Sequence, residues 1–144
     1  MNRYLARLPL FVGAIALVAL LTACSSALVR DVYTASGDGS TPDDLVRTTI
    51  FRGDDDLNVV VRLNAHNREL IVSATFTGPG GEVYVTDPLE AGETVTDVVL
   101  GLDWEAQGAV FWAEGEWQVE VYVDNDMKKI ARFTVQATEA PAAG

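Results

Sequence analysis

Apolar and polar residues alternate along most of the chain between residues 45 and 136. The alternation is clearest in four segments, at residues 57–63, 70–77, 117–123 and 131–136. A two-residue period puts one set of side chains on a core and the other in water, so each segment is predicted to be a strand. The predicted inward sets are Leu57, Val59, Val61 and Leu63; Leu70, Val72, Ala74 and Phe76; Trp117, Val119, Val121 and Val123; and Ala131, Phe133 and Val135.

Weaker alternation predicts three further strands, at residues 46–51, 82–86 and 94–100. Turn-forming residues separate the predicted strands, and residues 124–127 join the last two as a tight hairpin. No stretch has the period of a long amphipathic helix. About seven short strands with turn signals roughly every eight to twelve residues are typical of a β-sandwich, in which two sheets bury their inward sets together. The predicted fold is therefore all-β, a single antiparallel sandwich.

The last quarter of the chain sharpens this prediction. Gly115 and Trp117 begin the penultimate strand, polar residues 124–126 form the turn, and the aromatic-x-Val segment 133–135 closes the sheet. This arrangement resembles the closing hairpin of many bacterial immunoglobulin-like and fibronectin-type-III-like domains, which implies an immunoglobulin-like sandwich. The chain departs from the antibody pattern in two ways. It has one cysteine, so no Cys-Trp-Cys framework exists, and Trp117 stands where a tyrosine corner needs a tyrosine.

The first residues of the chain follow a different pattern. Arg3 and Arg7 precede an apolar run from residue 8 to residue 20, and small residues follow before Cys24, the only cysteine. A charged start, an apolar stretch and small residues before a cut site are typical of a secretory signal peptide. The alternative is a retained transmembrane helix. The run is short for a bilayer core, which needs about 20 apolar residues, and no basic cluster follows it.

The sequence Leu21-Thr22-Ala23-Cys24 resembles the lipobox of bacterial lipoproteins. The resemblance implies cleavage before Cys24, a diacylglyceryl group and fatty acids such as palmitate on this residue, and a protein held on the outer side of the cell membrane. Two or more acyl chains anchor a protein stably, whereas one does so only marginally. Where the cell has two membranes, Ser25 after the cysteine implies sorting to the outer one. No cofactor other than this covalent lipid is expected.

These patterns divide the chain into four parts. They are a signal peptide at residues 1–23, the lipidated cysteine with a flexible tether at 24–44, a sandwich domain at 45–136, and a disordered tail at 137–144. The tether is predicted chiefly because residues 36–44 are small, polar and turn-forming, with too little apolar content to pack.

The chain is strongly acidic. It has 10 basic and 21 acidic residues, which gives a formal net charge of −11. The predicted signal peptide holds two of the basic residues and none of the acidic ones, so the mature chain has eight basic residues and a charge of −13. This charge excludes nucleic acid as a partner, because affinity for nucleic acid comes from basic residues that meet phosphates. It also opposes adsorption onto anionic lipid headgroups.

The sequence offers little for catalysis or for zinc. His66 is the only histidine and lies in a predicted turn, while Cys24 is taken by lipid, so a nucleophile has no obvious base. A zinc site needs three or four His, Cys or acidic ligands. Glu114 and Glu116 are an alternative glycosidase pair, but a sandwich of this length leaves little room for a cleft. The chain is predicted not to be an enzyme.

Calcium is the one metal that the sequence allows, because calcium accepts oxygen ligands from loops. The candidate ligands are Asp54, Asp55 and Asp56 in one loop, and Asp124 and Asp126 in another. Neither loop has the spaced ligand series of a known calcium loop, so solvated turn acids are the preferred interpretation and no metal is predicted.

Aromatic residues supply the candidate binding surface. Trp104 and Trp112 lie in the connection at residues 101–115, where they either cap the end of the sandwich, which we prefer, or form an exposed platform. Phe111 and Tyr122 complete this candidate surface. Outward apolar side chains would form a patch if they cluster. They are Val60, Ile71, Tyr84, Tyr122 and Ile130.

The predicted function is that of a lipid-anchored, non-catalytic envelope protein. Its sandwich binds another envelope protein through a sheet edge, the outward apolar residues or the 101–115 connection. The alternative is a carbohydrate-binding module that uses Trp104 and Trp112, which requires two exposed aromatic rings on one surface. A third hypothesis, an enzyme, requires a cleft that holds convergent acids.

Overall fold

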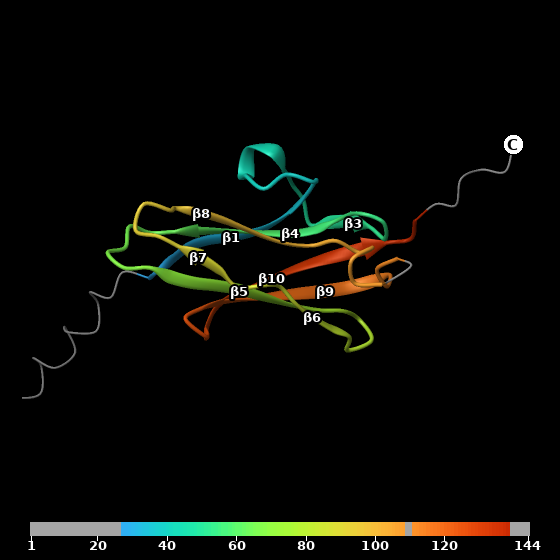
Figure 1. The fold of residues 1–144 in the computed structure, drawn as a ribbon. Helices are drawn as coiled ribbons and strands as arrows, with labels where there is room; N and C mark the ends of the chain where they lie inside the picture. The colour runs from blue at the N-terminus through green and yellow to red at the C-terminus, as the bar shows by residue number, and fades with distance from the viewer. Residues whose placement is uncertain (1–26, 109–110, 139–144) are drawn as a thin grey trace, which may run out of the picture.

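The computed structural model describes residues 27–108 and 111–138, which form two β-sheets packed face to face (Figure 1). The smaller sheet has four strands in the order β2-β1-β4-β8. The larger sheet has six, in the path β3-β10-β9-β5-β6 with β7 also paired to β5. The elements are β1 (Val29–Ser36), the 3-10 turn η1 (Pro42–Asp44), β2 (Val46–Arg47), β3 (Ile50–Arg52), β4 (Leu57–Leu63), β5 (Leu70–Thr77), β6 (Val83–Val85), β7 (Leu89–Ala91), β8 (Asp97–Leu102), β9 (Gly115–Val123) and β10 (Asp126–Gln136).

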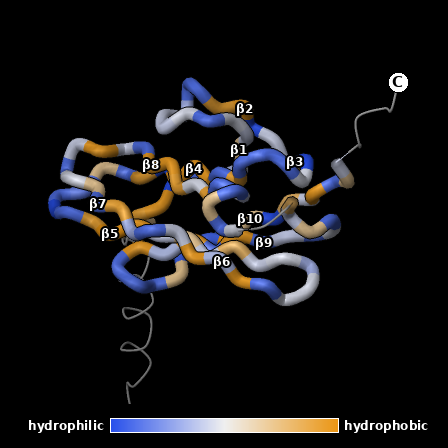
Figure 2. Tube along the Cα trace, turned by 45° about the vertical axis from the view of Figure 1, so that its right-hand side comes forward, coloured by the Kyte–Doolittle hydropathy of each residue, from blue (hydrophilic) through white to orange (hydrophobic). Residues whose placement is uncertain are grey.

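The core lies between the two sheets and is built from alternate residues of each strand. All the inward residues predicted for segments 57–63, 70–77 and 117–123 are buried. In β10 the predicted Phe133 and Val135 are buried, while Ala131 is partly buried against the core. Figure 2 shows apolar residues recurring along the strands and polar residues in the connecting loops. The prediction of an all-β sandwich is therefore confirmed.

Aromatic rings fill one part of this core. The ring of Phe133 lies in the centre, with ring centroids 5.0 Å from Phe51, 6.1 Å from Phe76 and 6.0 Å from Trp117. These four residues belong to β10, β3, β5 and β9, so one cluster ties together four strands of the larger sheet. Each such aromatic pair stabilises a fold by about 0.5–1.5 kcal/mol beyond the burial of its area.

The strand pairing matches that of immunoglobulin sandwiches. In these folds strands A, B and E share one sheet, and strands C, F and G share the other. Here β1, β4 and β8 share the smaller sheet, and β5, β9 and β10 share the larger. The chain changes sheets after β2, because β3 pairs in parallel with β10 through the register Ile50 to Thr134. The described chain enters at one end of the sandwich and leaves at the opposite end (Figure 1).

The tether predicted at residues 24–44 is wrong over most of its length. Strand β1 occupies residues 29–36 and pairs with β4 from Val29 to Ala35, and both of these residues are buried. The domain therefore begins well before residue 45. The alternation of β1 is hidden in the sequence because the register shifts between Val29 and Asp31, which interrupts the two-residue period.

Two further predicted boundaries change. The segment predicted as one strand at 46–51 is two short strands, β2 and β3, which belong to different sheets. Strand β8 begins at Asp97, three residues later than predicted, and β7 was not predicted. The predicted signal peptide, Cys24 and most of the predicted tail lie outside the described residues. In the part of the chain that the structure describes, no helix is long and apolar enough to span a bilayer.

The β6–β7 edge of the larger sheet is interrupted at Thr86. The backbone N–H of Thr86 donates to the carbonyl of Ala74 at 2.9 Å, and the Thr86 hydroxyl accepts from the N–H of Ala74 at 3.0 Å. The side chain thus replaces a backbone partner, and Pro88 follows two residues later. The edge is consequently divided into two strands of three residues each.

Gly101 lies where the two neighbouring strands β4 and β8 leave no room for a side chain. A Cβ at this position would lie 2.5 Å from Oδ1 of Asn58, its cross-strand partner. Asn58 is buried, and its Nδ2 donates to the carbonyl of Gly37 at 2.9 Å, so it cannot swing away without losing this bond.

We expect Gly101→Ala to lower the free energy of unfolding by about 1–3 kcal/mol, the usual cost of overpacking. Urea unfolding followed by tryptophan fluorescence measures this change. In the double variant Gly101→Ala/Asn58→Ala the two losses of stability should be less than additive. Asn58→Ala removes the amide group with which the new Cβ at position 101 would clash. Strict additivity would contradict the proposed contact.

Candidate functional site: the outer face of the larger sheet

The outer face of the larger sheet carries the side chains that alternate with its core residues. On β9 these are Glu116, Gln118, Glu120 and Tyr122, and their cross-strand partners on β10 include Arg132 and Thr134. This face is open to solvent, because the smaller sheet covers only the opposite face. It is therefore the broadest sheet surface of the described chain that is available to a ligand.

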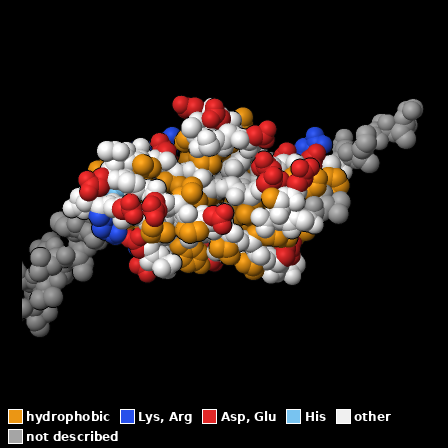
Figure 3. Space-filling model, in the orientation of Figure 1, with side chains coloured by type: hydrophobic (Ala, Val, Ile, Leu, Met, Phe, Trp, Pro, Cys, Tyr) orange, Lys and Arg blue, Asp and Glu red, His pale blue; other side chains and the backbone are white. Residues whose placement is uncertain are grey.

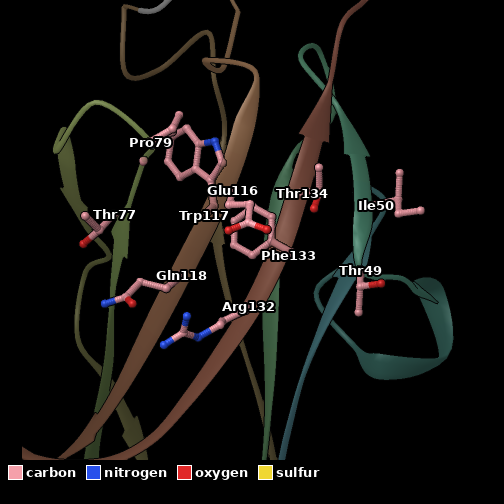
Figure 4. Close-up of a pocket in the computed structure, with 11 residues that line it drawn as sticks. Thr49, Ile50, Thr77, Pro79, Glu116, Trp117, Gln118, Arg132, Phe133 and Thr134 are labelled. Carbon is pink, nitrogen blue, oxygen red and sulfur yellow. The ribbon is translucent and has the colours of Figure 1, made fainter.

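A groove of about 940 Å³ crosses this face (Figure 4). Its floor includes the cross-strand pair Gln118 and Arg132, with Thr134 beside them. Pro79 lies on one side and Ile50 on the other, so the groove runs from the β5–β6 turn to the edge strand β3. The groove is open to solvent along the sheet face.

Both walls of the groove are fixed by local contacts. Gly115 has a φ of 136°, and a Cβ there would lie 3.0 Å from the ring of Pro79, so glycine allows this turn to pack against the start of β9. On the other side, the Thr48 hydroxyl donates to the carbonyl of Ile50 at 2.9 Å and accepts from its N–H at 3.1 Å. These bonds set the position at which β3 begins.

Charge in the groove is sparse. Arg132 is the only cation among the lining residues and Glu116 the only carboxylate. Arg132 forms no ion pair with any other described residue. Further along the same face, the hydroxyl of Tyr122 donates to Oε2 of Glu120 at 2.7 Å. This hydrogen bond to a carboxylate raises the pKa of Tyr122, because it favours the protonated phenol.

Exposed apolar side chains lie at several places on this face, and one of them, Ile50, lines the groove. Ile50 is 54% exposed, and Val83 and Val85 are 58% and 64% exposed. Val83 and Val85 pair with Thr77 and Thr75, whose side chains point outward, so they belong to the same face. Further outward apolar residues of β5 and β10 are Ile71, Met127 and Ile130. Exposed apolar side chains gathered on one face are typical of protein-interaction surfaces.

The predicted outward positions are only partly right. Ile71, Tyr122 and Ile130 do lie on this outer face. Tyr84 points inward, with its ring 5.2 Å from Trp112 and partly buried against the core. Val60 faces outward from the smaller sheet but is fully buried. It lies between neighbours on both adjacent strands, which the sequence of one strand could not reveal.

The predicted aromatic surface is not a single site. Trp112 is 3% exposed, and its Nε1 donates to the carbonyl of Asp55 at 2.8 Å, so it caps the core rather than facing solvent. Trp104 is partly buried and lies 5.5 Å from the exposed ring of Phe111. Tyr122 lies near the far end of β9 from this pair. The interpretation of a capped sandwich end is correct for Trp112.

The first loop of candidate calcium ligands lies in an acidic hollow of about 490 Å³ beside Trp104. Its carboxylates are Asp38, Asp54, Asp55, Asp56, Asp103 and Glu105. Asp54 lies beside Arg52, with 3.4 Å between Oδ1 and Nε, and Asp55 accepts the N–H of Arg52 at 2.7 Å. Burial raises the pKa of Asp56, and repulsion from Asp103 and the other nearby acids raises it further.

The second loop of candidate ligands lies at the opposite end of the sandwich. Asp124 accepts the N–H of Ile71 at 3.0 Å and pairs with Arg68, and both contacts lower its pKa. Asp126 lies 4.0 Å from Lys128. Within residues 27–108 and 111–138, no group of three or more His, Cys, Asp or Glu side chains is arranged to hold a metal ion.

Several residues of the groove were not singled out from the sequence. Arg132, Gln118 and Thr134 sit between recognised core residues, so the alternation already placed them outward. What the alternation could not give was the order of the strands, which brings Ile50 and Pro79 to the two sides of the same groove.

No protein-family model matches the sequence, and no curated protein does. Solved structures that are similar in fold include the following two. One is the Pseudomonas fluorescens alkylpurine DNA glycosylase AlkC bound to DNA containing an abasic site analog, with 15% identity, a TM-score of 0.43 and coverage of 77% of this chain and 31% of that chain. The other is the immunoglobulin-like protein PA1606 from Pseudomonas aeruginosa, with 14% identity, a TM-score of 0.39 and coverage of 74% of this chain and 97% of that chain. The similarity concerns the fold alone.

The opposite pKa shifts of Asp56 and Asp124 predict opposite effects of pH. Because the pKa of Asp56 is raised on folding, its contribution destabilises the fold at neutral pH and is relieved as pH falls toward its raised pKa. The lowered pKa of Asp124 gives a contribution that stabilises the fold above its ordinary pKa and is lost as pH falls. We expect Asp56→Asn to raise the melting temperature at neutral pH and Asp124→Asn to lower it.

Thermal unfolding between neutral pH and about pH 4, near the ordinary pKa of aspartate, checks both expectations. The two substitutions are isosteric, and each serves as the control for the other. Both differences from the unsubstituted protein should shrink as pH falls. A melting temperature that fell at neutral pH with Asp56→Asn would show that this carboxylate is stabilised in the hollow.

Proposed function

We propose that this protein is a lipid-anchored component of the bacterial cell envelope, in which a non-catalytic immunoglobulin-like sandwich binds another envelope protein. The observation that carries the proposal is the open outer face of the larger sheet, with its groove and its exposed apolar residues. Ile50, Val83 and Val85 expose apolar side chains on that face, and burial of such area drives most protein association.

The placement of the protein in the envelope rests on its sequence. Cys24 ends a lipobox-like segment after a signal-peptide pattern, so the chain would be held by its lipid on the outer side of a membrane, the outer membrane where there are two. No acidic residue precedes Asp31, which agrees with the first 23 residues acting as a signal peptide that directs export of the protein.

Two observations support a non-catalytic role. Both ring nitrogens of His66 face backbone carbonyls, those of Arg68 at 2.8 Å and Val95 at 2.9 Å, so the single histidine of the chain is occupied as a structural link. The groove has one carboxylate among its lining residues, whereas a glycosidase needs a pair across the scissile bond.

The sugar-binding alternative loses its two-tryptophan platform, because Trp112 is buried. Trp104 and Phe111 form an aromatic pair at the end of the sandwich, but the pair adjoins the acidic hollow and lies away from the groove. Protein binding is therefore the function that the outer face supports best.

The first test concerns the anchor. We expect Cys24→Ser to abolish lipidation, so that the protein leaves the membrane fraction and keeps its uncleaved signal segment. Mass spectrometry of the N-terminal peptide and detergent partitioning measure these changes. An unsubstituted protein whose Cys24 peptide carried no lipid would contradict the anchoring proposal.

The second test concerns the outer face. We expect the pair Val83→Glu and Val85→Glu to reduce the capture of a crosslinked partner from intact envelopes at least several-fold, because two charges would be placed in an apolar contact. Val46→Glu is a matched control, since Val46 is 69% exposed but belongs to the smaller sheet. Exposed substitutions of this kind change stability by only about 0.5 kcal/mol, so all variants should fold. Equal capture by all the variants would contradict the proposed face.

A further inference from the structure

The described residues begin at Ala27, the third residue after Cys24. The carbonyl of Ala27 accepts a hydrogen bond from Nδ2 of Asn64 at 2.6 Å, and the carbonyl of Leu28 accepts the backbone N–H of the same residue at 2.9 Å. Asn64 follows the last residue of β4, so the entering chain is bound to a central strand. Only Ser25 and Ser26 separate this bound segment from Cys24.

Such a short connection limits how far the domain can lie from its anchor. Three peptide units join the Cα atoms of Cys24 and Ala27, and their fully extended length is at most about 11 Å. If Cys24 carries the proposed lipid, its backbone lies at the membrane interface. The end of the sandwich at which Ala27 enters must then lie within about the depth of the headgroup layer.

We name this end the anchor end and define it by the loops at residues 64–69, 92–96 and 124–126. The loops are linked to one another. His66 faces the carbonyl of Val95 in the second loop, and Arg68 pairs with Asp124 in the third. The anchor end is thus one connected surface, and a short tether fixes its position as a whole.

Charge is distributed unequally between the two ends of the molecule. Near the anchor end lie five of the eight basic residues that follow Cys24, namely Arg30, Arg62, Arg68, Lys128 and Lys129, together with seven acidic residues, namely Asp31, Glu69, Glu90, Glu93, Asp97, Asp124 and Asp126. Three of these bases pair with acids of the same end, Arg62 with Asp97, Arg68 with Asp124 and Lys128 with Asp126. The opposite end holds the acidic hollow, with six carboxylates and Arg52 beside it. Figure 3 shows acidic side chains at both ends of one face, including a group at the right-hand end, next to the C-terminal trace. Anionic headgroups repel that end most strongly.

We propose that the sandwich stands on the membrane, with the anchor end against the lipid headgroups and the acidic end directed away from them. The inference rests on the proposed lipidation of Cys24 and adds the orientation and the lipid contact. The nine residues of β9 span about 30 Å, so the acidic end lies at least that far from the anchor end. The groove, near the start of β9, is then presented to a partner well above the headgroups.

Energy transfer to the membrane surface tests this orientation. Because Cys24 is acylated, Asn67→Cys at the anchor end and Gln107→Cys at the acidic end each add a single free thiol, and both sites are exposed. The lipidated variants, labelled with a donor dye, are reconstituted into vesicles of phosphatidylcholine with equal parts of phosphatidylglycerol and a headgroup-linked acceptor. We expect several-fold more efficient transfer from position 67 than from position 107.

Matched controls separate this inference from the anchoring proposal. A long Gly-Ser linker inserted between Ser26 and Ala27 should make energy transfer from positions 67 and 107 equal in vesicles of phosphatidylcholine alone. The longer tether no longer limits the distance between the domain and the membrane. Equal transfer from both positions in the unlengthened protein, with the protein still floating with vesicles, would overturn the orientation and leave the anchor intact. Failure to float with vesicles would overturn the anchor and the orientation together.

Discussion

The packing of the two sheets against each other is the constraint on which the rest of the structure depends. The only cysteine precedes the domain, so no disulfide joins the sheets and the core must hold them alone. Within the larger sheet, the ring of Phe133 packs against Phe51, Phe76 and Trp117 on three other strands. This cluster forms part of the larger sheet's aromatic contribution to the core. The groove lies on the outer side of the same strands, so the packed core lies directly beneath its floor.

The two faces of the larger sheet carry different kinds of side chain, because one packs on the core and the other faces solvent. Inward positions of β9 and β10 carry large apolar residues, while the alternate positions carry Gln118, Arg132 and Thr134. These outward side chains form the floor of the groove, and Pro79 of the β5–β6 turn lines one side of it.

Much of the fold could be predicted from the sequence, because antiparallel strands with one wet face leave a two-residue period. That period correctly gave the inward residues of β4, β5 and β9. It failed for β1, where a shift of register next to Val29 breaks the alternation, and for Val60, which is buried by neighbouring strands. The groove could not be predicted, since it joins Ile50 and Pro79, which only the strand order brings to one surface.

The interruption of the β6–β7 edge at Thr86 has a consequence if the protein is anchored on a membrane as proposed. Copies anchored in one plane would meet at high local concentration and in similar orientations. These conditions favour pairing between the edge strands of neighbouring molecules. The edge is divided into two three-residue strands with Pro88 between them. It therefore offers too few consecutive backbone N–H and C=O groups to pair with the edge of another molecule. The hydrogen bond to the hydroxyl of Thr86 would thereby help anchored molecules to remain separate on the membrane.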